Sequence, residues 1–457
     1  MRIPIKNLVV LLLLFSGSLN AQQDSTLLQK KTLIKDGWNF GVLPAVSFNT
    51  DLGFQYGGLI NLFHYGDGSR YPNYDHSFYF EASRYTKGSG LLRFAYDSDQ
   101  LLKGVRLSFD LSYMPEQAID FFGFNGYEAV YNADWVEDGN RQYRSRMFYK
   151  HKRDMLRLHT DLSGSLFNSP LQWAAGFEFY NFVVGSVDID RLNRGKDEED
   201  QLPAVEDVPG LFELYQQWDI ISAEEATGGR FFALKGGLIY DTRDFEPNPT
   251  RGIWTALLLY VVPRQFSNLQ EGFSRISLTH RQYFSLVPNK LVFAGRLGWQ
   301  SSIGGRVPFY AQPLMITTRL RGAYSEGLGG QRSLRGIMRN RVVGDGMAYA
   351  NIELRWKIIQ RRLFNQNFYL AVNGFTDVGQ LTGKIDVAAF FEQLPQNHQH
   401  YHVPDYYDAD AEKPHWSVGM GVKLAMNENF ILSADYGLAL NDQDGKSGLY
   451  IGLNYLF

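Results

Sequence analysis

The chain has 457 residues, of which 44% are hydrophobic, 15% are aromatic and none is cysteine, and its formal net charge is −3. This composition excludes a helical membrane protein but permits a transmembrane β-barrel, because only one face of each barrel strand has to be apolar. The near balance of charge gives no sign of a nucleic-acid partner, and the absence of cysteine fits an exported protein.

The N-terminus has the features of a secretory signal. Arg2 and Lys6 precede an apolar run, Leu8–Phe15, and small and polar residues continue to Ala21. The run is too short to cross a bilayer as a helix, so residues 1–21 are predicted to be a signal peptide that is cleaved near Ala21. Residues 22–37 would then form a short periplasmic lead, which is too small to fold as a domain.

From Trp38 to the end of the chain, apolar and polar residues alternate with a period of two. The stretches Val105–Tyr113 and Ala348–Ile358 alternate throughout, which is typical of strands with one apolar and one polar face. The polar faces carry Glu, Lys, Arg and Asp side chains, which the core of a β-sandwich would not accept. Residues 38–457 are therefore predicted to be a closed barrel with lipid outside and polar contacts inside. A soluble sandwich or propeller is the alternative, and no blade repeat supports it.

The alternation predicts sixteen antiparallel strands. Their approximate ranges are 38–49, 52–64, 75–86, 89–98, 103–114, 143–166, 170–183, 230–243, 252–263, 273–286, 290–301, 346–359, 367–378, 415–426, 428–440 and 448–457. The sixth range is long enough for two strands, and it is counted once because short and long connections then alternate. Four connections at one end are long, namely 116–142, 185–229, 304–345 and 381–415. Short periplasmic turns and long outer loops are expected of a multi-pass barrel in the outer membrane of a Gram-negative cell.

One of the long connections carries a glycine-rich stretch, Gly327–Ile337, which contains the sequence Leu334-Arg335-Gly336. Two carboxylates further along the chain, Glu353 and Asp377, fall on the polar faces of their predicted strands by parity. An arginine in a barrel lumen needs such a partner, and the planar guanidinium suits a bidentate pair with a carboxylate.

The last residues also carry a signal. Gly452, Tyr455 and Phe457 belong to a final stretch that ends on an aromatic residue, with a second aromatic residue two positions before it. This pattern resembles the recognition signal of outer-membrane barrels, so we expect these residues to direct assembly.

Three motifs together resemble the bacterial surface-antigen barrel of the BamA/TamA superfamily. They are Gly237–Asp244 followed by Pro247, Pro249 and Gly252, then Leu334-Arg335-Gly336, and then Phe375-x-Asp377-x-Gly379. The resemblance is clearest over residues 229–457.

The resemblance implies a sixteen-stranded barrel whose sixth outer loop folds back into the lumen. Arg335 would be the arginine that meets acidic residues of strands twelve and thirteen, here Glu353 and Asp377. Asp241, Arg243 and Asp244 would either have a specific role in the family or form a lumen salt-bridge network near the periplasmic rim. The chain departs from the family at Ile337, where an aromatic residue is usual. The short lead also has no room for a POTRA domain, so a member without POTRA domains is expected.

These observations predict an outer-membrane barrel, surrounded by lipid, that takes part in protein assembly, insertion or export with a separate periplasmic or surface protein partner. A passive channel or porin and a surface-loop binding protein are the alternatives. No enzymatic activity is expected, because the chain lacks the motifs Gly-x-Ser-x-Gly and His-Glu-x-x-His. The histidines His398, His400, His402 and His415 lack ordered metal-ligand spacing and are interpreted as part of a polar surface loop, so neither a metal nor a cofactor is expected.

Overall fold

The computed structural model of the chain describes residues 34–457, apart from 72, 247, 319–326, 364–365, 396, 399–400 and 427–429. The predicted signal peptide, residues 1–21, and most of the predicted lead, residues 22–37, lie outside the described residues.

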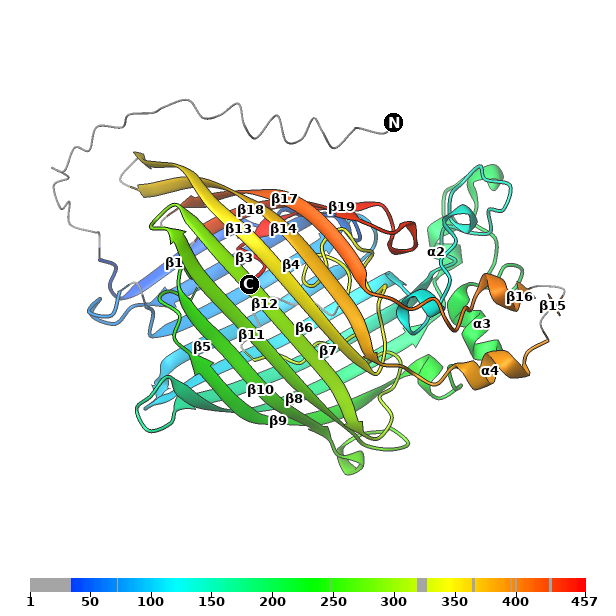
Figure 1. Cartoon of the computed structure of the whole chain (residues 1–457), viewed down its shortest axis with the longest axis horizontal. Coiled ribbons are helices and arrows are strands. Elements are labelled where there is room, and N and C mark those ends of the chain that lie inside the picture. Colours follow the sequence, from blue (N-terminus) through cyan, green and yellow to red (C-terminus); the bar gives the residue numbers. More distant parts are fainter. Residues whose placement is uncertain are drawn as a thin grey trace.

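The strands form one antiparallel sheet that closes on itself into a barrel, with the strands tilted across its wall (Figure 1). The strands of the wall are β1 (Trp38–Pro44), β2 (Ser47–Asn49), β3 (Gly53–His64), β4 (His76–Tyr85), β5 (Gly90–Leu102), β6 (Val105–Asp120), β7 (Lys150–Ser165), β8 (Leu171–Gly185), β9 (Gly228–Asp241), β10 (Gly252–Val262), β11 (Phe273–Val287), β12 (Leu291–Gly304), β13 (Gly346–Leu363), β14 (Gln366–Gly383), β17 (His415–Met426), β18 (Phe430–Ala439) and β19 (Ser447–Leu453). Both β1 and β2 pair with β3, so they are two pieces of the first barrel strand. The wall therefore has sixteen strands, which confirms the predicted fold class.

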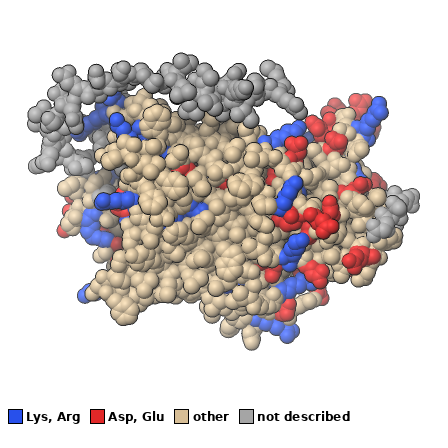
Figure 2. All heavy atoms as spheres, viewed as in Figure 1, with Lys and Arg blue, Asp and Glu red and all other residues tan. Residues whose placement is uncertain are grey.

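The two faces of the wall differ as the alternation requires. Large apolar residues such as Leu257, Leu354 and Val422 are exposed on the outside, whereas charged residues of the opposite face, such as Glu353 and Asp377, are buried. On the face shown in Figure 2, few charged residues lie over the middle of the barrel and more lie towards its two ends. An outer band with few charges is what contact with lipid requires.

Several strand ends differ from the prediction. β6 continues to Asp120 and pairs there with Lys150, the first residue of β7. Residues 143–149, which were predicted to belong to a strand, instead pack into the outer end of the molecule, where Phe148 is fully buried. The last strand ends at Leu453 and not at Phe457.

The long connections gather at one end of the barrel and form a cap over it, on the right in Figure 1. Aromatic residues from all four of them share one buried cluster, among them Phe148, Trp218, Phe309 and Tyr406. The remaining helices and short strands are η1 (Gly126–Glu128), η2 (Ala133–Trp135), α2 (Ile189–Asn193), η3 (Glu198–Asp200), α3 (Leu211–Gln217), η4 (Glu225–Thr227), η5 (Arg264–Phe266), α4 (Ala388–Gln393), β15 (Asn397–His398), β16 (Tyr401–His402), η6 (Val403–Asp405) and η7 (Asp442–Asp444). In the part of the chain that the structure describes, no helix has the length and apolar character needed to cross a membrane.

Candidate functional site

Loop 6, the connection between β12 and β13, returns into the lumen and places Arg335 against two carboxylates. Asp377 accepts three hydrogen bonds from Arg335, donated by the backbone N–H, Nε and Nη2, each 3.0 Å long. Nη1 of the same arginine donates to Glu353 Oε1 at 2.5 Å, and its guanidinium lies 3.5 Å from the centre of the Phe375 ring. The structure thus brings four of the predicted residues together, and we refer to this group as the loop-6 anchor.

Two glycines let loop 6 lie directly against the wall. Gly336 has a φ of +95°, and a Cβ at this position would lie 2.6 Å from the carbonyl carbon of Gly437 on β18. A Cβ at Gly379 would lie 2.6 Å from Leu334 Cδ1. Gly336 is therefore needed for close approach of the two backbones, whereas Gly379 leaves room for the Leu334 side chain. Ile337 is fully buried in a small apolar cluster beside the anchor, so an aliphatic side chain fills this position.

The wall also holds loop 6 through a residue that the sequence analysis did not single out. Asn351 Nδ2 donates to the carbonyl of Ser333 at 2.7 Å, and Asn351 Oδ1 accepts from Arg296 Nε at 2.8 Å. Arg296 Nη2 in turn donates to the carbonyl of Arg332 at 3.0 Å. Asn351 shares the lumen face of Glu353 by parity, so the same alternation could have identified it.

The C-terminal tail, Asn454–Phe457, turns into the lumen and does not continue the last strand. Asn454 has a φ of +69°, and Tyr455 and Phe457 are buried, with exposed fractions of 5% and 3%. Arg355 Nη2 donates to the carbonyl of Phe457 at 2.8 Å, and the Arg355 guanidinium lies 4.2 Å from the Tyr455 ring. The predicted strand 448–457 is therefore wrong beyond Leu453, because the tail rings pack on lumen cations. Gly452 remains within β19.

Arg355 connects the tail to the loop-6 anchor. Its Nε donates to Glu353 Oε2 at 2.7 Å, while the other oxygen of that carboxylate accepts from Arg335. A second pair lies beside them, in which Lys423 Nζ donates to Asp435 Oδ2 at 2.5 Å. Neither pair was predicted from the sequence, although all of these residues lie on polar strand faces.

The seam between the last and first barrel strands is short. β19 pairs with β2 only at Tyr450–Asn49 and Ile451–Phe48, and the backbone N–H of Thr50 adds one hydrogen bond of 3.1 Å to the carbonyl of Leu449. β13 and β14, in contrast, pair along almost their whole length. In the part of the chain that the structure describes, the only strand with residues paired to β1 is β3, so no described strand is in register with the other edge of β1.

The predicted residues Asp241, Arg243 and Asp244 lie where β9 ends at the periplasmic rim. Arg243 donates from Nε and Nη2 to the two oxygens of Asp241, at 2.9 and 2.7 Å. Asp244 Oδ1 accepts from the backbone N–H of Thr250 at 2.9 Å and Oδ2 accepts from its hydroxyl at 2.5 Å. Burial alone would raise the pKa of Asp244, but these hydrogen bonds outweigh it and lower the pKa below its usual value.

The interpretation of the four histidines as a polar surface loop is wrong for His415. This residue is fully buried, its Nδ1 lies 2.6 Å from Asp444 Oδ1, and its ring stacks on Tyr127 with centroids 3.9 Å apart. It joins three outer connections within the cap. His402 is exposed, and the side chains of His398 and His400 lie outside the described part of the chain. Among the residues described, no group of His, Asp and Glu could hold a metal ion.

Comparison with known proteins gives a family match and two similar structures. A family model described as the Omp85 superfamily domain matches residues 76–457. No curated protein matches the chain significantly. The structure is similar to that of BamA from Haemophilus ducreyi lacking POTRA domains 1–3, at 16% sequence identity and a TM-score of 0.51, with 92% of this chain and 71% of that chain covered. It is also similar to CdiB from Escherichia coli, at 10% identity and a TM-score of 0.52, with 91% of this chain and 63% of that chain covered. The chain therefore spans less than two thirds of that CdiB chain, and at these identities the similarity concerns the fold alone.

Proposed function

The chain belongs to the Omp85 superfamily, and on this premise we propose that this outer-membrane barrel inserts or exports client proteins together with a separate periplasmic or surface partner. The proposed role is that of an assembly factor or transporter and not of an enzyme. The short seam between the first and last strands is the observation that supports it most.

The seam offers a place where a client strand gains backbone partners. Only two residue pairs join β19 to β2, and the free edge of β1 continues from Pro44 towards the periplasm at Trp38. In lipid, unpaired N–H and C=O groups cost several kcal/mol each. An extended segment of another chain that adds to this edge would satisfy them, as in other cases of β-strand addition.

The position of the tail supports this role of the seam. If the tail continued β19 in the register of Ile451–Phe48, Tyr455–Phe457 would lie opposite the Pro44 end of β1 and occupy its edge. The tail is instead held in the lumen by Arg355. The loop-6 anchor lies in the lumen beside it, which favours a lateral path through the seam over a path through an open pore.

A disulfide across the seam tests the proposal. Phe48 and Ile451 are paired across it, and directly opposed residues in antiparallel strands lie close enough for a disulfide. The chain has no native cysteine, so Phe48→Cys with Ile451→Cys introduces the only thiols. The assay measures how fast a urea-unfolded outer-membrane barrel, added as a client, folds into liposomes that contain the protein. We expect the rate of client folding to be at least tenfold lower with the oxidised protein than with the unmodified protein. A reductant should restore the rate.

The matched control places two cysteines across a pair of strands whose hydrogen-bonded pairing is long and continuous. Leu257 and Leu278 are directly opposed in β10 and β11 and are also exposed to lipid. This disulfide should leave client folding unchanged. Equal rates for the seam-locked and control proteins would reject a lateral path. Isolation of the tagged protein from native outer membranes, with identification of what accompanies it, tests the separate partner.

A further inference from the structure

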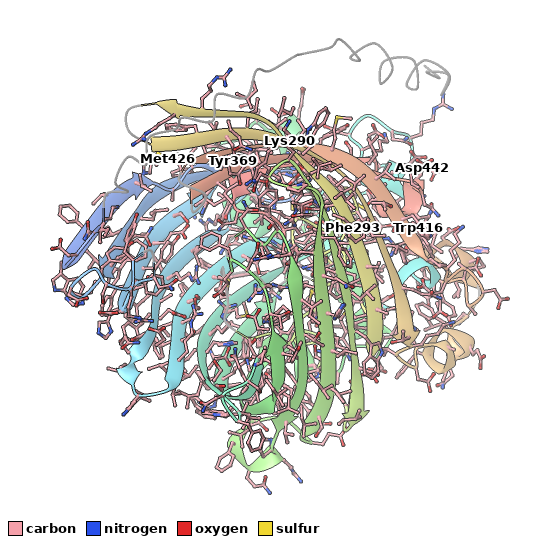
Figure 3. The ribbon with its side chains drawn as sticks, turned by 60° about the vertical axis from the view of Figure 1, so that its left-hand side comes forward. Lys290, Phe293, Tyr369, Trp416, Met426 and Asp442 are labelled. Atoms are coloured by element: carbon pink, nitrogen blue, oxygen red, sulfur yellow. The ribbon has the colours of Figure 1, made fainter. Side chains whose placement is uncertain are left out.

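The connection between β9 and β10, Thr242–Arg251, makes two contacts with distant parts of the wall. Glu246 Oε2 accepts from Arg106 Nη1 on β6 at 2.9 Å. Asn248 Nδ2 donates to the hydroxyl of Tyr369 on β14 at 3.0 Å. Asn248 and Tyr369 are both buried, with exposed fractions of 4% and 5%. Figure 3 shows Tyr369 beside Met426 at the periplasmic end of the wall, far from Asp442 at the outer end.

These two contacts lie on opposite sides of the barrel. Counted around the wall with β1 and β2 as one strand, β6 is the fifth strand and β14 the thirteenth of sixteen. Glu246 and Asn248 are only two residues apart, so about 7 Å of extended chain separates them. Contacts to opposite walls from so short a stretch require that the stretch lies near the middle of the periplasmic mouth.

We propose that the connection between β9 and β10, through its described residues 242–246 and 248–251, is a strap that crosses the periplasmic mouth of the barrel and controls access to the lumen from the periplasm. Its tethers are Glu246–Arg106 on one side and Asn248–Tyr369 on the other. The ion pair is partly exposed and so adds little holding energy. The hydrogen bond from Asn248 is the stronger tether, because both of its partners are buried and a buried hydrogen bond is costly to break.

The motif residues at the rim form the scaffold of this strap. Asp244 ties the start of the strap to its end through Thr250, and Arg243 is fixed by Asp241. Gly252 closes the strap with a φ of +97°, and a Cβ there would lie 2.3 Å from the carbonyl oxygen of Thr242. A strap whose two ends are fixed in this way can hold its middle residues over the mouth. This gives the Asp241–Asp244 sequence a structural purpose beyond a local salt bridge.

The strap is a second barrier, separate from loop 6. The loop-6 anchor contacts β13 and β14 through Glu353 and Asp377, whereas the strap meets β14 at Tyr369, near the periplasmic end of that strand. Tyr369 also shares a buried cluster with Tyr455 of the tail. Tyr369 therefore links the strap to the tail.

A cysteine reporter beneath the strap tests the proposal without any client, so its outcome is independent of the seam experiment. Ser163 is the cross-strand neighbour of Arg106 and has an exposed fraction of 5%. In the Ser163→Cys protein in nanodiscs, a charged maleimide should react slowly. Adding Glu246→Ala and Asn248→Ala should raise the labelling rate at least tenfold, because both tethers of the strap are lost.

The control pair is Asn73→Ala with Lys290→Ala, two exposed residues of other periplasmic connections, and it should leave the labelling rate unchanged. An unchanged rate in the strap variant, with the barrel folded as judged by its heat-dependent gel mobility, would overturn the proposal. If the double variant fails to fold, Asn248→Cys with Tyr369→Cys and a short bismaleimide gives an independent answer. Cross-linking is then expected in the native membrane, and its absence would also overturn the proposal.

Discussion

At the scale of single residues, Arg335 is a buried cation whose charge is neutralised by carboxylates from two neighbouring strands. Its exposed fraction is 1%, and those of Glu353 and Asp377 are no larger. Removal of one partner from such a buried group leaves uncompensated charge and costs about 3–5 kcal/mol in a dry environment. The strand ladder does not involve the Arg335 side chain, so this cost falls on the position of loop 6 and not on barrel closure.

We therefore expect Arg335→Ala to form the barrel but to release loop 6. The folded variant should keep its heat-dependent gel mobility, while protease should cut the segment Gly327–Asp345 much faster than in the unmodified protein. Arg335→Lys is the matched control, because it keeps the positive charge but loses the planar guanidinium. We expect an intermediate rate of cleavage, since an ammonium cannot bind Asp377 through two parallel bonds. Identical cleavage of all three proteins would show that the anchor does not hold the loop.

At the scale of elements, the tail is the part whose expected role changes with the structure. A last strand that reached Phe457 would have closed the barrel through these residues, but the seam pairs lie at Tyr450 and Ile451. We nevertheless predict that assembly fails when Tyr455–Phe457 is deleted. Deletion removes two buried rings, and loss of one buried aromatic side chain typically costs about 3–5 kcal/mol. Less folded, heat-modifiable protein in the outer membrane is the expected result. Tyr455→Phe keeps the ring and should assemble normally, whereas normal assembly of the deletion would contradict the prediction.

The sequence could predict those elements whose two faces follow from the local alternation of apolar and polar residues. The parity of Glu353 and Asp377 placed both on the lumen face, and the closed barrel makes that face the inside. The inward turn of the tail depends on Arg355 and on rings packed around it, which no local pattern encodes. The strap contacts are likewise long-range, since Asn248 and Tyr369 are 121 residues apart. The burial of His415 follows from cap connections that meet only in the folded chain.

At the scale of the whole molecule, chain segments lie at the outer end and inside the lumen, and the proposed strap adds a third level at the periplasmic mouth. The cap covers the outer end with a shared aromatic cluster, loop 6 fills the lumen around Arg335, and the proposed strap crosses the periplasmic mouth. A passive channel needs an open path through all three levels. A barrel that acts at its seam needs no open path through the lumen, because the client would leave sideways into the lipid.

Electrical recordings distinguish these two kinds of barrel. In planar bilayers the unmodified protein should show small, flickering conductance, because the closures lie in series. Arg335→Ala should give larger or noisier conductance, and its combination with Glu246→Ala and Asn248→Ala should give a larger increase than either change alone. The exchange Arg335→Glu with Asp377→Arg should recover part of the original behaviour if the pair is direct. A porin would behave differently, with steady, large conductance in the unmodified protein that Arg335→Ala does not change, and that result would favour the passive channel over a barrel that acts at its seam.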